Sequence, residues 1–192
     1  MPAAEPFKLL DWDVPDALKF YSSGRGEPAY KDLSNFGASP IWLPARYNPS
    51  VIVLYPDVET AFQAGKAQDE RTHTFICAGS TPMDAKHRGG NRSKVRPPAD
   101  WDKFSPLWML YCLRAKYELP RYRQLLLSTG DRVLVEDSPR DDRWGGYSPR
   151  ARTYTGRNLL GRALMRVRAE IRDEMEVIEL PFAPAPAQAS YA

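Results

Sequence analysis

The sequence holds few of the residues that metal sites and nucleophilic hydrolases need. Its 192 residues include two cysteines, Cys77 and Cys112, and two histidines, His73 and His87, and neither pair follows a metal-ligand spacing. Both cysteines have apolar neighbours, so we expect buried free thiols, and we expect structural or surface histidines. A Gly-rich phosphate loop and a G-x-S-x-G elbow are also absent. These absences argue against P-loop, dinucleotide-binding and serine-hydrolase functions, and no metal or other cofactor is expected.

Long apolar runs are missing as well. No stretch approaches the roughly 20 apolar residues of a membrane-spanning helix, and the N-terminus lacks the basic and apolar pattern of a signal peptide. Together with the expected free thiols, this predicts a cytoplasmic protein that has no membrane partner. The length suits a single domain with a core of its own, and 18 prolines predict long irregular connections.

The charge is small in sum but uneven along the chain. A net charge of +3 argues against a protein that binds bulk polyanions by neutralising many phosphates. Residues 85–97 carry six Lys, Arg or His side chains and no acid, and residues 149–157 add three arginines. Two basic segments of loop-like composition indicate a phosphate-bearing ligand, and a solvated basic surface is the alternative.

The apolar pattern predicts a mainly α protein with a few short β-strands, an α+β class built as one compact domain. Strands are expected at 18–23, 39–45, 50–56 and 131–137, and helices at 58–69, 70–78, 80–89, 105–119 and 120–130. A last helix presents an apolar face made by Leu160, Leu164, Val167 and Ile171. Between them, residues 137–157 form a loop without hydrophobic periodicity, and loops of this length are usually functional or disordered.

Helix ends can be read from particular residues. Asp57 is the expected cap of the helix that follows it, and Ser80 or Thr81 is the expected cap of the helix at 80–89. Pro106 is expected in the first turn of the helix at 105–119, where its missing N–H costs no hydrogen bond.

A narrow polar stripe stands out on the helix at 58–69. Glu59, Gln63 and Lys66 fall within roughly 60° of one another at about 100° per residue. The stripe has two interpretations. Pairs at i,i+3 and i,i+4 stabilise solvated helix faces, but an acid, an amide and an amine on one face also suit a catalytic site.

Further carboxylates gather near the long loop, at Glu136, Asp141 and Asp142. Cleavage of a glycosidic bond uses two carboxyl groups, one to transfer a proton and one to stabilise positive charge at the sugar carbon. Tryptophans supply flat surfaces on which a base or ring can stack; the candidates are Trp101, Trp108 and Trp144, with core packing expected for Trp108.

A series of ordered motifs gives the chain a family resemblance. The motifs are "FYSS" (20–23), "LSNF" (33–36), "VETAFQAGKAQD" (58–69), "STPMDAKHRG" (80–89), "DWDKF" (100–104), "LRAKY" (113–117), "LLLSTGDRVLVEDSPRDDRWG" (125–145) and "GRNLLGRALMRVR" (156–168). In these motifs and their order the chain resembles the YbiA-like NADAR family, named for its association with NAD and ADP-ribose chemistry. The resemblance implies a YbiA-like domain over 19–176. By composition, the Pro-punctuated residues 1–18 are expected to form a loosely attached arm and the Pro/Ala-rich residues 177–192 a disordered tail.

The resemblance also implies a function. Characterised members are N-glycosidases that act on phosphorylated ribosylamino-pyrimidine intermediates of riboflavin synthesis or on ADP-ribosylated guanine. We therefore expect a hydrolase that cleaves the C–N bond between a ribose and a nucleobase-type amine. The expected partner is a phosphorylated ribosyl or ADP-ribosyl small molecule, with ADP-ribosylated nucleic acid as a further substrate. The alternative is a non-catalytic sensor module that binds ADP-ribose or a related nucleotide.

Site residues follow from the same motifs. The implied catalytic residues are Glu59, Lys66 and Asp141. The expected substrate-binding residues are Asn35, Phe36, Gln63, Trp101, Trp144, Gly145, Asn158, Gly161, Arg88 and Arg92, and further candidate phosphate contacts are Lys94, Arg96, Arg152 and Arg157. Two mechanisms are open: Glu59 and Asp141 act as an acid/base and electrostatic pair, or Lys66 attacks the opened sugar and forms a Schiff base.

Overall fold

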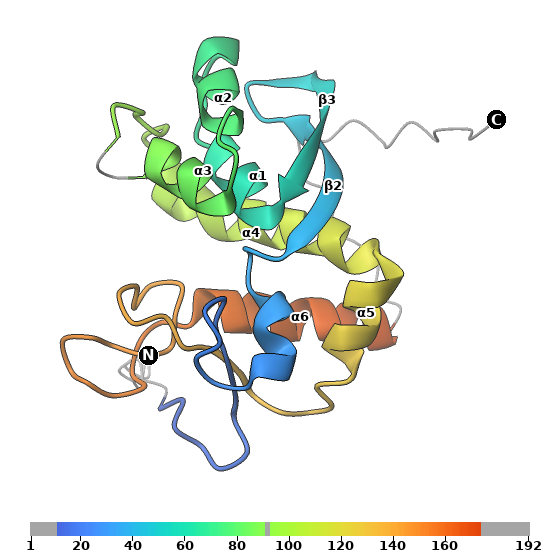
Figure 1. Cartoon of the computed structure of the whole chain (residues 1–192), viewed down its shortest axis with the longest axis vertical. Coiled ribbons are helices and arrows are strands. Elements are labelled where there is room, and N and C mark those ends of the chain that lie inside the picture. Colours follow the sequence, from blue (N-terminus) through green and yellow to red (C-terminus); the bar gives the residue numbers. More distant parts are fainter. Residues whose placement is uncertain (1–10, 91–92, 174–192) are drawn as a thin grey trace, which may run out of the picture.

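The computed structural model describes residues 11–90 and 93–173. In chain order the elements are β1 (Leu18–Phe20), the 3-10 helix η1 (Pro28–Leu33), β2 (Ala38–Ala45), β3 (Asn48–Asp57), α1 (Val58–Ala64), α2 (Glu70–Cys77), α3 (Pro82–Gly89), α4 (Trp101–Glu118), α5 (Pro120–Leu127), β4 (Leu134–Glu136) and α6 (Leu159–Asp173). The predicted class, mainly α with a few short strands, is confirmed (Figure 1).

The strands form two small sheets. β2 and β3 make an antiparallel hairpin, whereas β1 pairs in parallel with β4, with Phe20 opposite Glu136. The parallel pair joins segments far apart in the sequence. Its partners could not be matched from the sequence, because strands of three residues carry too little pattern to specify a partner. The pairing brings Glu136 to the start of the long loop at 137–157.

Helix α4 lies across the middle of the molecule and forms the centre of the core (Figure 1). It contacts α1 and β2 on one side and α5 and α6 on the other. Trp108 is fully buried, as expected, and its indole Nε1 donates a hydrogen bond of 3.1 Å to the carbonyl of Ala61. The bond ties α1 directly to α4, so the polar stripe of α1 rests on the helix at the centre of the core.

The helix expected at 58–69 is shorter than predicted, and the helix expected at 70–78 begins where predicted. α1 ends at Ala64, and Asp69 caps α2 by accepting a hydrogen bond of 2.7 Å from the amide of Thr72. The expected caps Asp57 and Thr81 are both confirmed, since each side chain accepts an amide N–H of its own helix.

The predicted start of α4 was wrong. The helix begins at Trp101, and Pro106 lies inside it. A proline inside a helix removes the hydrogen bond to the carbonyl four residues earlier, which is that of Asp102. Arg143 Nη2 donates to this carbonyl at 2.7 Å and to Ser105 Oγ at 2.9 Å. The proline therefore creates an acceptor that anchors the loop at 137–157 to α4.

Some predictions concern residues beyond those described. The first ten residues of the predicted arm and the whole predicted tail at 177–192 lie outside the described residues. Within residues 11–90 and 93–173, no helix combines the length and the apolar composition that crossing a membrane requires.

Candidate active site

The polar stripe of α1 is buried. Glu59 and Gln63 are each 5% exposed and Lys66 is 8% exposed. Gln63 Nε2 donates to Glu59 Oε1 at 2.8 Å, and Lys66 Nζ donates to Gln63 Oε1 at 2.6 Å and to the carbonyl of Gly89 at 2.7 Å. A solvated helix face is therefore excluded, and the three side chains form one hydrogen-bonded relay.

Burial changes the acidity of both ends of this relay. It raises the pKa of Glu59, and the nearby Lys86, Gln63 and Lys66 oppose that rise only in part. Burial also lowers the pKa of Lys66 to about 8, although the charge of Glu59 acts in the opposite direction. The site thus holds a carboxyl that keeps its proton longer than usual and an amine that loses its proton earlier than usual.

Aromatic rings cover the relay. The ring of Phe62 lies 5.4 Å from that of Trp101 and 5.1 Å from that of Trp144, between centroids. Lys66 Nζ lies 5.8 Å from the Phe62 centroid and 6.0 Å from that of Trp101. The two tryptophans expected at the ligand therefore meet through Phe62, and the rings keep the amine in a weakly polar environment.

Asp141 reaches the site from the long loop. Its Oδ1 accepts hydrogen bonds of 3.0 Å from the backbone amides of Arg143 and Trp144, and its carbonyl accepts one from Gly145. These bonds close a tight turn. The turn fixes the Asp141 carboxyl and the Trp144 ring relative to each other, and Trp144 then packs on Phe62 of α1.

Two charged residues of the site were not among the predicted catalytic or binding residues, Glu136 and Lys86. Burial and the nearby charge of Asp141 raise the pKa of Glu136 to about 8, while Lys86 acts against the rise. The signals were present in the sequence, because Glu136 precedes the acidic loop and Lys86 lies in the motif at 80–89. The charges of Asp141, Lys86 and Glu59 all influence the pKa of Glu136, so these groups belong to one site.

Asn158 and Gly161 lie behind Glu136, at the start of α6. Asn158 is fully buried; its Nδ2 donates to the carbonyl of Leu134 at 2.9 Å and its Oδ1 accepts the amide of Glu136 at 3.2 Å. Its φ of 50° is tolerated by Asn better than by most residues. A Cβ at Gly161 would lie 2.1 Å from the carbonyl of Leu134. Both residues let α6 approach β4 closely, and this contact positions Glu136.

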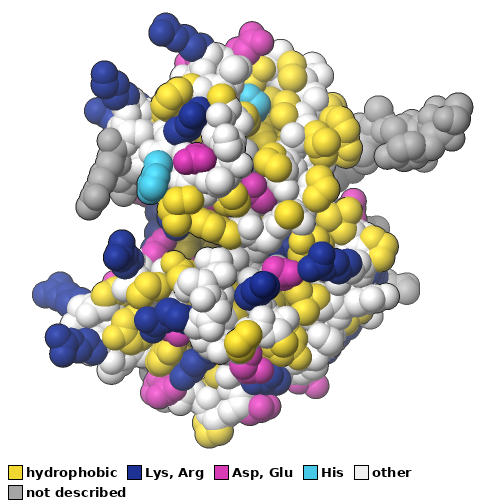
Figure 2. Space-filling view, in the orientation of Figure 1, with side chains coloured by type: hydrophobic (Ala, Val, Ile, Leu, Met, Phe, Trp, Pro, Cys, Tyr) yellow, Lys and Arg dark blue, Asp and Glu magenta, His cyan; other side chains and the backbone are white. Residues whose placement is uncertain are grey.

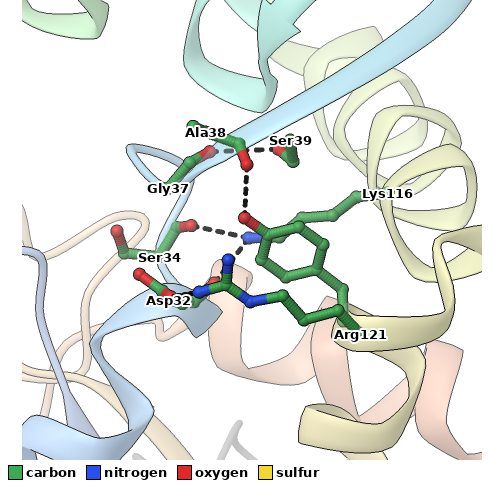
Figure 3. Close-up of polar contacts among 8 residues, drawn as sticks. Asp32, Ser34, Gly37, Ala38, Ser39, Lys116 and Arg121 are labelled. Atoms are coloured by element: carbon green, nitrogen blue, oxygen red, sulfur yellow. Dashed lines mark hydrogen bonds and ion pairs between the residues drawn. The ribbon is translucent and has the colours of Figure 1, made fainter.

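Asn35 and Phe36 lie in the turn that follows η1. Lys116 contacts the backbone of Asp32 and Ser34 just before them (Figure 3). The buried Lys116 Nζ donates to the carbonyls of Asp32 and Ser34 at 2.7 and 2.8 Å. The carbonyl of Asn35 accepts the amide of Glu59, and its buried Oδ1 has no hydrogen-bond partner among the described residues. A buried acceptor without a partner is unusual and suits a donor from a ligand.

The predicted phosphate contacts are dispersed. Arg88 lies on α3 and donates a hydrogen bond of 2.8 Å to the carbonyl of Phe75 on α2, so its guanidinium is directed toward α2. Arg92 lies outside the described residues. Arg152 and Arg157 are exposed on the loop at 137–157. Figure 2 shows Lys and Arg side chains on both sides of a hollow between the part built by α1–α3 and the part that contains this loop.

Comparisons with known proteins agree with this picture. The family model described as NADAR domain matches residues 19–172. The chain is 35% identical over 158 residues to N-glycosidase YbiA of Shigella boydii serotype 4, which covers 82% of this chain and 89% of that protein. It is 30% identical over 182 residues to the chloroplastic riboflavin biosynthesis protein PYRR of Zea mays, covering 89% of this chain but 28% of that protein.

The fold is shared as well. The NMR structure of the Escherichia coli protein YbiA matches with a TM-score of 0.65 and 29% identity, covering 87% of this chain and 94% of that one. The relatives named N-glycosidases confirm the enzyme class that the sequence predicted. On the family match, the identities and the shared fold, this chain belongs to the NADAR domain family.

Proposed function

We propose that this N-glycosidase cleaves the bond between the anomeric carbon of a phosphorylated ribosyl or ADP-ribosyl group and a nucleobase-type amine. The observation that carries the proposal is the buried relay of Glu59, Gln63 and Lys66, which lies under aromatic rings and within electrostatic reach of Glu136. A carboxyl group that keeps its proton longer than usual and a water-poor setting favour acid-assisted cleavage of a C–N bond, and an amine of lowered pKa suits a Schiff-base route. Relatives named for N-glycosidase activity support it.

In a direct route, α1 supplies the proton donor and the loop at 137–157 supplies the stabilising carboxylate. Glu59, whose pKa is raised, donates its proton to the departing nitrogen as the C–N bond breaks. The Asp141 carboxylate stabilises the positive charge that forms at the anomeric carbon. Water then adds its oxygen to this carbon and returns a proton to Glu59, which restores the enzyme.

A second route passes through Lys66. Glu59 protonates the ring oxygen, the sugar ring opens, and the anomeric carbon forms an iminium group with the leaving amine. Neutral Lys66 Nζ adds to that carbon, the amine departs with a proton, and water hydrolyses the resulting lysine Schiff base to release the open-chain sugar. Burial and a pKa of about 8 are the properties that a Schiff-base lysine needs, and the pH prediction in the Discussion tests this route.

The substrate class is the next part of the proposal. Lys86 next to Glu59, and the exposed Arg150, Arg152 and Arg157 of the loop, favour a substrate with more than one phosphate group. This supports an ADP-ribosyl substrate, including ADP-ribosylated nucleic acid. The riboflavin-related name of the Zea mays protein supports a ribosylamino-pyrimidine phosphate instead. Because Cys77 and Cys112 are free thiols, we also propose a reducing compartment, the cytoplasm.

A product assay tests the function. The protein is incubated with guanine-ADP-ribosylated DNA and, separately, with a ribosylamino-pyrimidine phosphate, and free sugar is measured. We expect release from one of the two substrates and a loss of about 10²- to 10⁴-fold in Glu59→Gln. Glu70→Gln, an exposed acid in the first turn of α2, is the matched control and retains wild-type activity.

The assay also decides against the alternative function. If neither substrate releases sugar and calorimetry shows tight binding of ADP-ribose, the protein is a nucleotide sensor and the proposed activity is wrong. Release at the wild-type rate by Glu59→Gln would contradict both routes.

A further inference from the structure

A short segment that precedes the matched family domain is attached to the loop at 137–157. Trp12 lies before residue 19, where the family match begins, and is 8% exposed. Its amide donates to the carbonyl of Tyr154 at 2.9 Å and its indole Nε1 donates to the carbonyl of Gly156 at 2.7 Å. One residue therefore holds two neighbouring carbonyls of the loop at 137–157.

The backbone that Trp12 contacts is hydrogen-bonded to the residues that follow the turn of Asp141 and Trp144. The amide of Gly156 donates to the carbonyl of Gly146 at 2.7 Å, and the amide of Asn158 donates to that of Gly145 at 2.9 Å. A Cβ at Gly156 would lie 2.6 Å from the carbonyl of Gly145, so the two strands of backbone are in close contact. Residues 145 and 146 directly follow the turn that fixes Asp141 and Trp144.

A second set of contacts fastens the same segment. Lys19 Nζ pairs with Asp13 at 2.7 Å and lies 3.8 Å from the centroid of the Tyr154 ring. Tyr154 in turn donates its hydroxyl to Asp137 Oδ1 at 3.1 Å, and Asp137 pairs with Arg25. Through Lys19, Tyr154 of the loop is thus joined to Asp13 in the segment before β1, and through its hydroxyl it is joined to Asp137, the first residue of the loop.

We propose that Trp12 is a positioning residue of the active site, which sets the place of Asp141 and Trp144 through Gly156 and Gly146. The role rests on the proposed function of that site. Trp12 acts on the loop and not on α1, because its hydrogen bonds go to residues 154 and 156 while α1 is held by α4 and by the turn at 32–38. The functional unit therefore begins before the matched family domain.

Hydrogen exchange tests the positioning without a substrate. In Trp12→Ala we expect amides of 141–157 to exchange about tenfold faster, while those of 58–66 keep the wild-type rate. Val14→Ala is the matched control, since Val14 is 40% exposed in the same segment, and it leaves both regions unchanged. Unchanged exchange in the loop, or equal acceleration in both regions, would overturn the proposal.

Kinetics provide the second readout. Partial unfolding removes active enzyme, which lowers the apparent kcat and leaves KM unchanged, whereas a displaced Trp144 weakens substrate binding. We expect KM to rise about tenfold in Trp12→Ala and less in Trp12→Phe, which keeps an aromatic ring but lacks the indole N–H. A lowered kcat with wild-type KM contradicts the positioning of Trp144, and wild-type exchange at 141–157 in the same variant contradicts that of Asp141 as well. If the wild-type protein is inactive on both substrates, the proposed function is refuted. Amide hydrogen exchange then still decides whether Trp12 orders the loop at 137–157.

Discussion

The active site joins two regions that are supported in different ways. Glu59, Gln63 and Lys66 stand on one buried helix that rests on α4, so their mutual geometry is fixed over a few residues. Asp141 and Trp144 stand on a loop whose place depends on contacts with α4, β4, α6 and the segment around Trp12. Side chains on a packed helix keep a fixed geometry, whereas loops vary more easily in sequence and position. We therefore expect α1 to supply most of the chemistry, and the loop to supply Asp141 and most of the choice of substrate.

The largest effect we expect from the loop is chemical. Asp141→Asn keeps an oxygen that can accept the amides of Arg143 and Trp144 but removes the negative charge, so kcat falls about 10²-fold. The neighbouring Asp142→Asn is the matched control, because that side chain is exposed. A wild-type rate in Asp141→Asn would mean that the loop contributes binding alone.

The helix region can be tested through pH. The Lys66 route needs the neutral amine, so kcat/KM is expected to rise with pH, to reach half of its maximum near pH 8 and to level off above it. Borohydride reduction during turnover then traps the sugar on Lys66, as mass spectrometry of the digested protein detects. Lys66→Met removes both effects, and Lys103→Met, an exposed lysine on α4, retains them. Activity that falls as pH rises, without a trapped adduct, selects the direct route through Glu59.

The close contact between α6 and β4, next to Glu136, is expected to affect stability. Gly161→Ala places a methyl group against the carbonyl of Leu134 and lowers the free energy of unfolding by about 1–3 kcal/mol. Gly37→Ala is the control, since the nearest atom to its new Cβ lies at 3.5 Å, an ordinary contact. Urea denaturation measures both. Equal stability of the two variants would show that α6 can move away from β4 without cost.

The smallest expected effect concerns Glu136. Its pKa is about 8 in the folded protein and near 4.5 in the unfolded chain, so the folded state binds more protons between these values and stability falls as pH rises through them. Glu136→Gln lacks this dependence. Its Tm should therefore exceed that of the wild type by more at pH 8.5 than at pH 4.5. A pH-independent difference in Tm would contradict the shifted pKa.

Helical geometry explains why one half of the site could be predicted. The spacing of Glu59, Gln63 and Lys66 puts them on one face whatever surrounds the helix, and the cap at Asp57 marks where it starts. The burial of that face does not follow from spacing, because a solvated stripe has the same pattern. The family motifs, not the helical period, favoured the interpretation that the structure supports.

The other half depends on contacts that no local pattern encodes. Pro106 was expected at a helix start, and its actual place inside α4 supplies an acceptor for Arg143, which lies far along the chain. The parallel pairing of β1 with β4 likewise sets Glu136, and strands of three residues do not specify a partner. The motif at 156–168 drew attention to Asn158, but only the fold shows that its side chain is engaged with β4.

A double-mutant cycle tests most directly whether the two regions form one site. Sugar release is measured for wild type, Glu59→Gln, Asp141→Asn and the double variant, with folding checked by Tm. Groups that act on the same bond are strongly non-additive, so we predict that the double variant is about as slow as the slower single variant. If the two losses multiply, Glu59 and Asp141 act independently, and a single site built from α1 and the loop is contradicted.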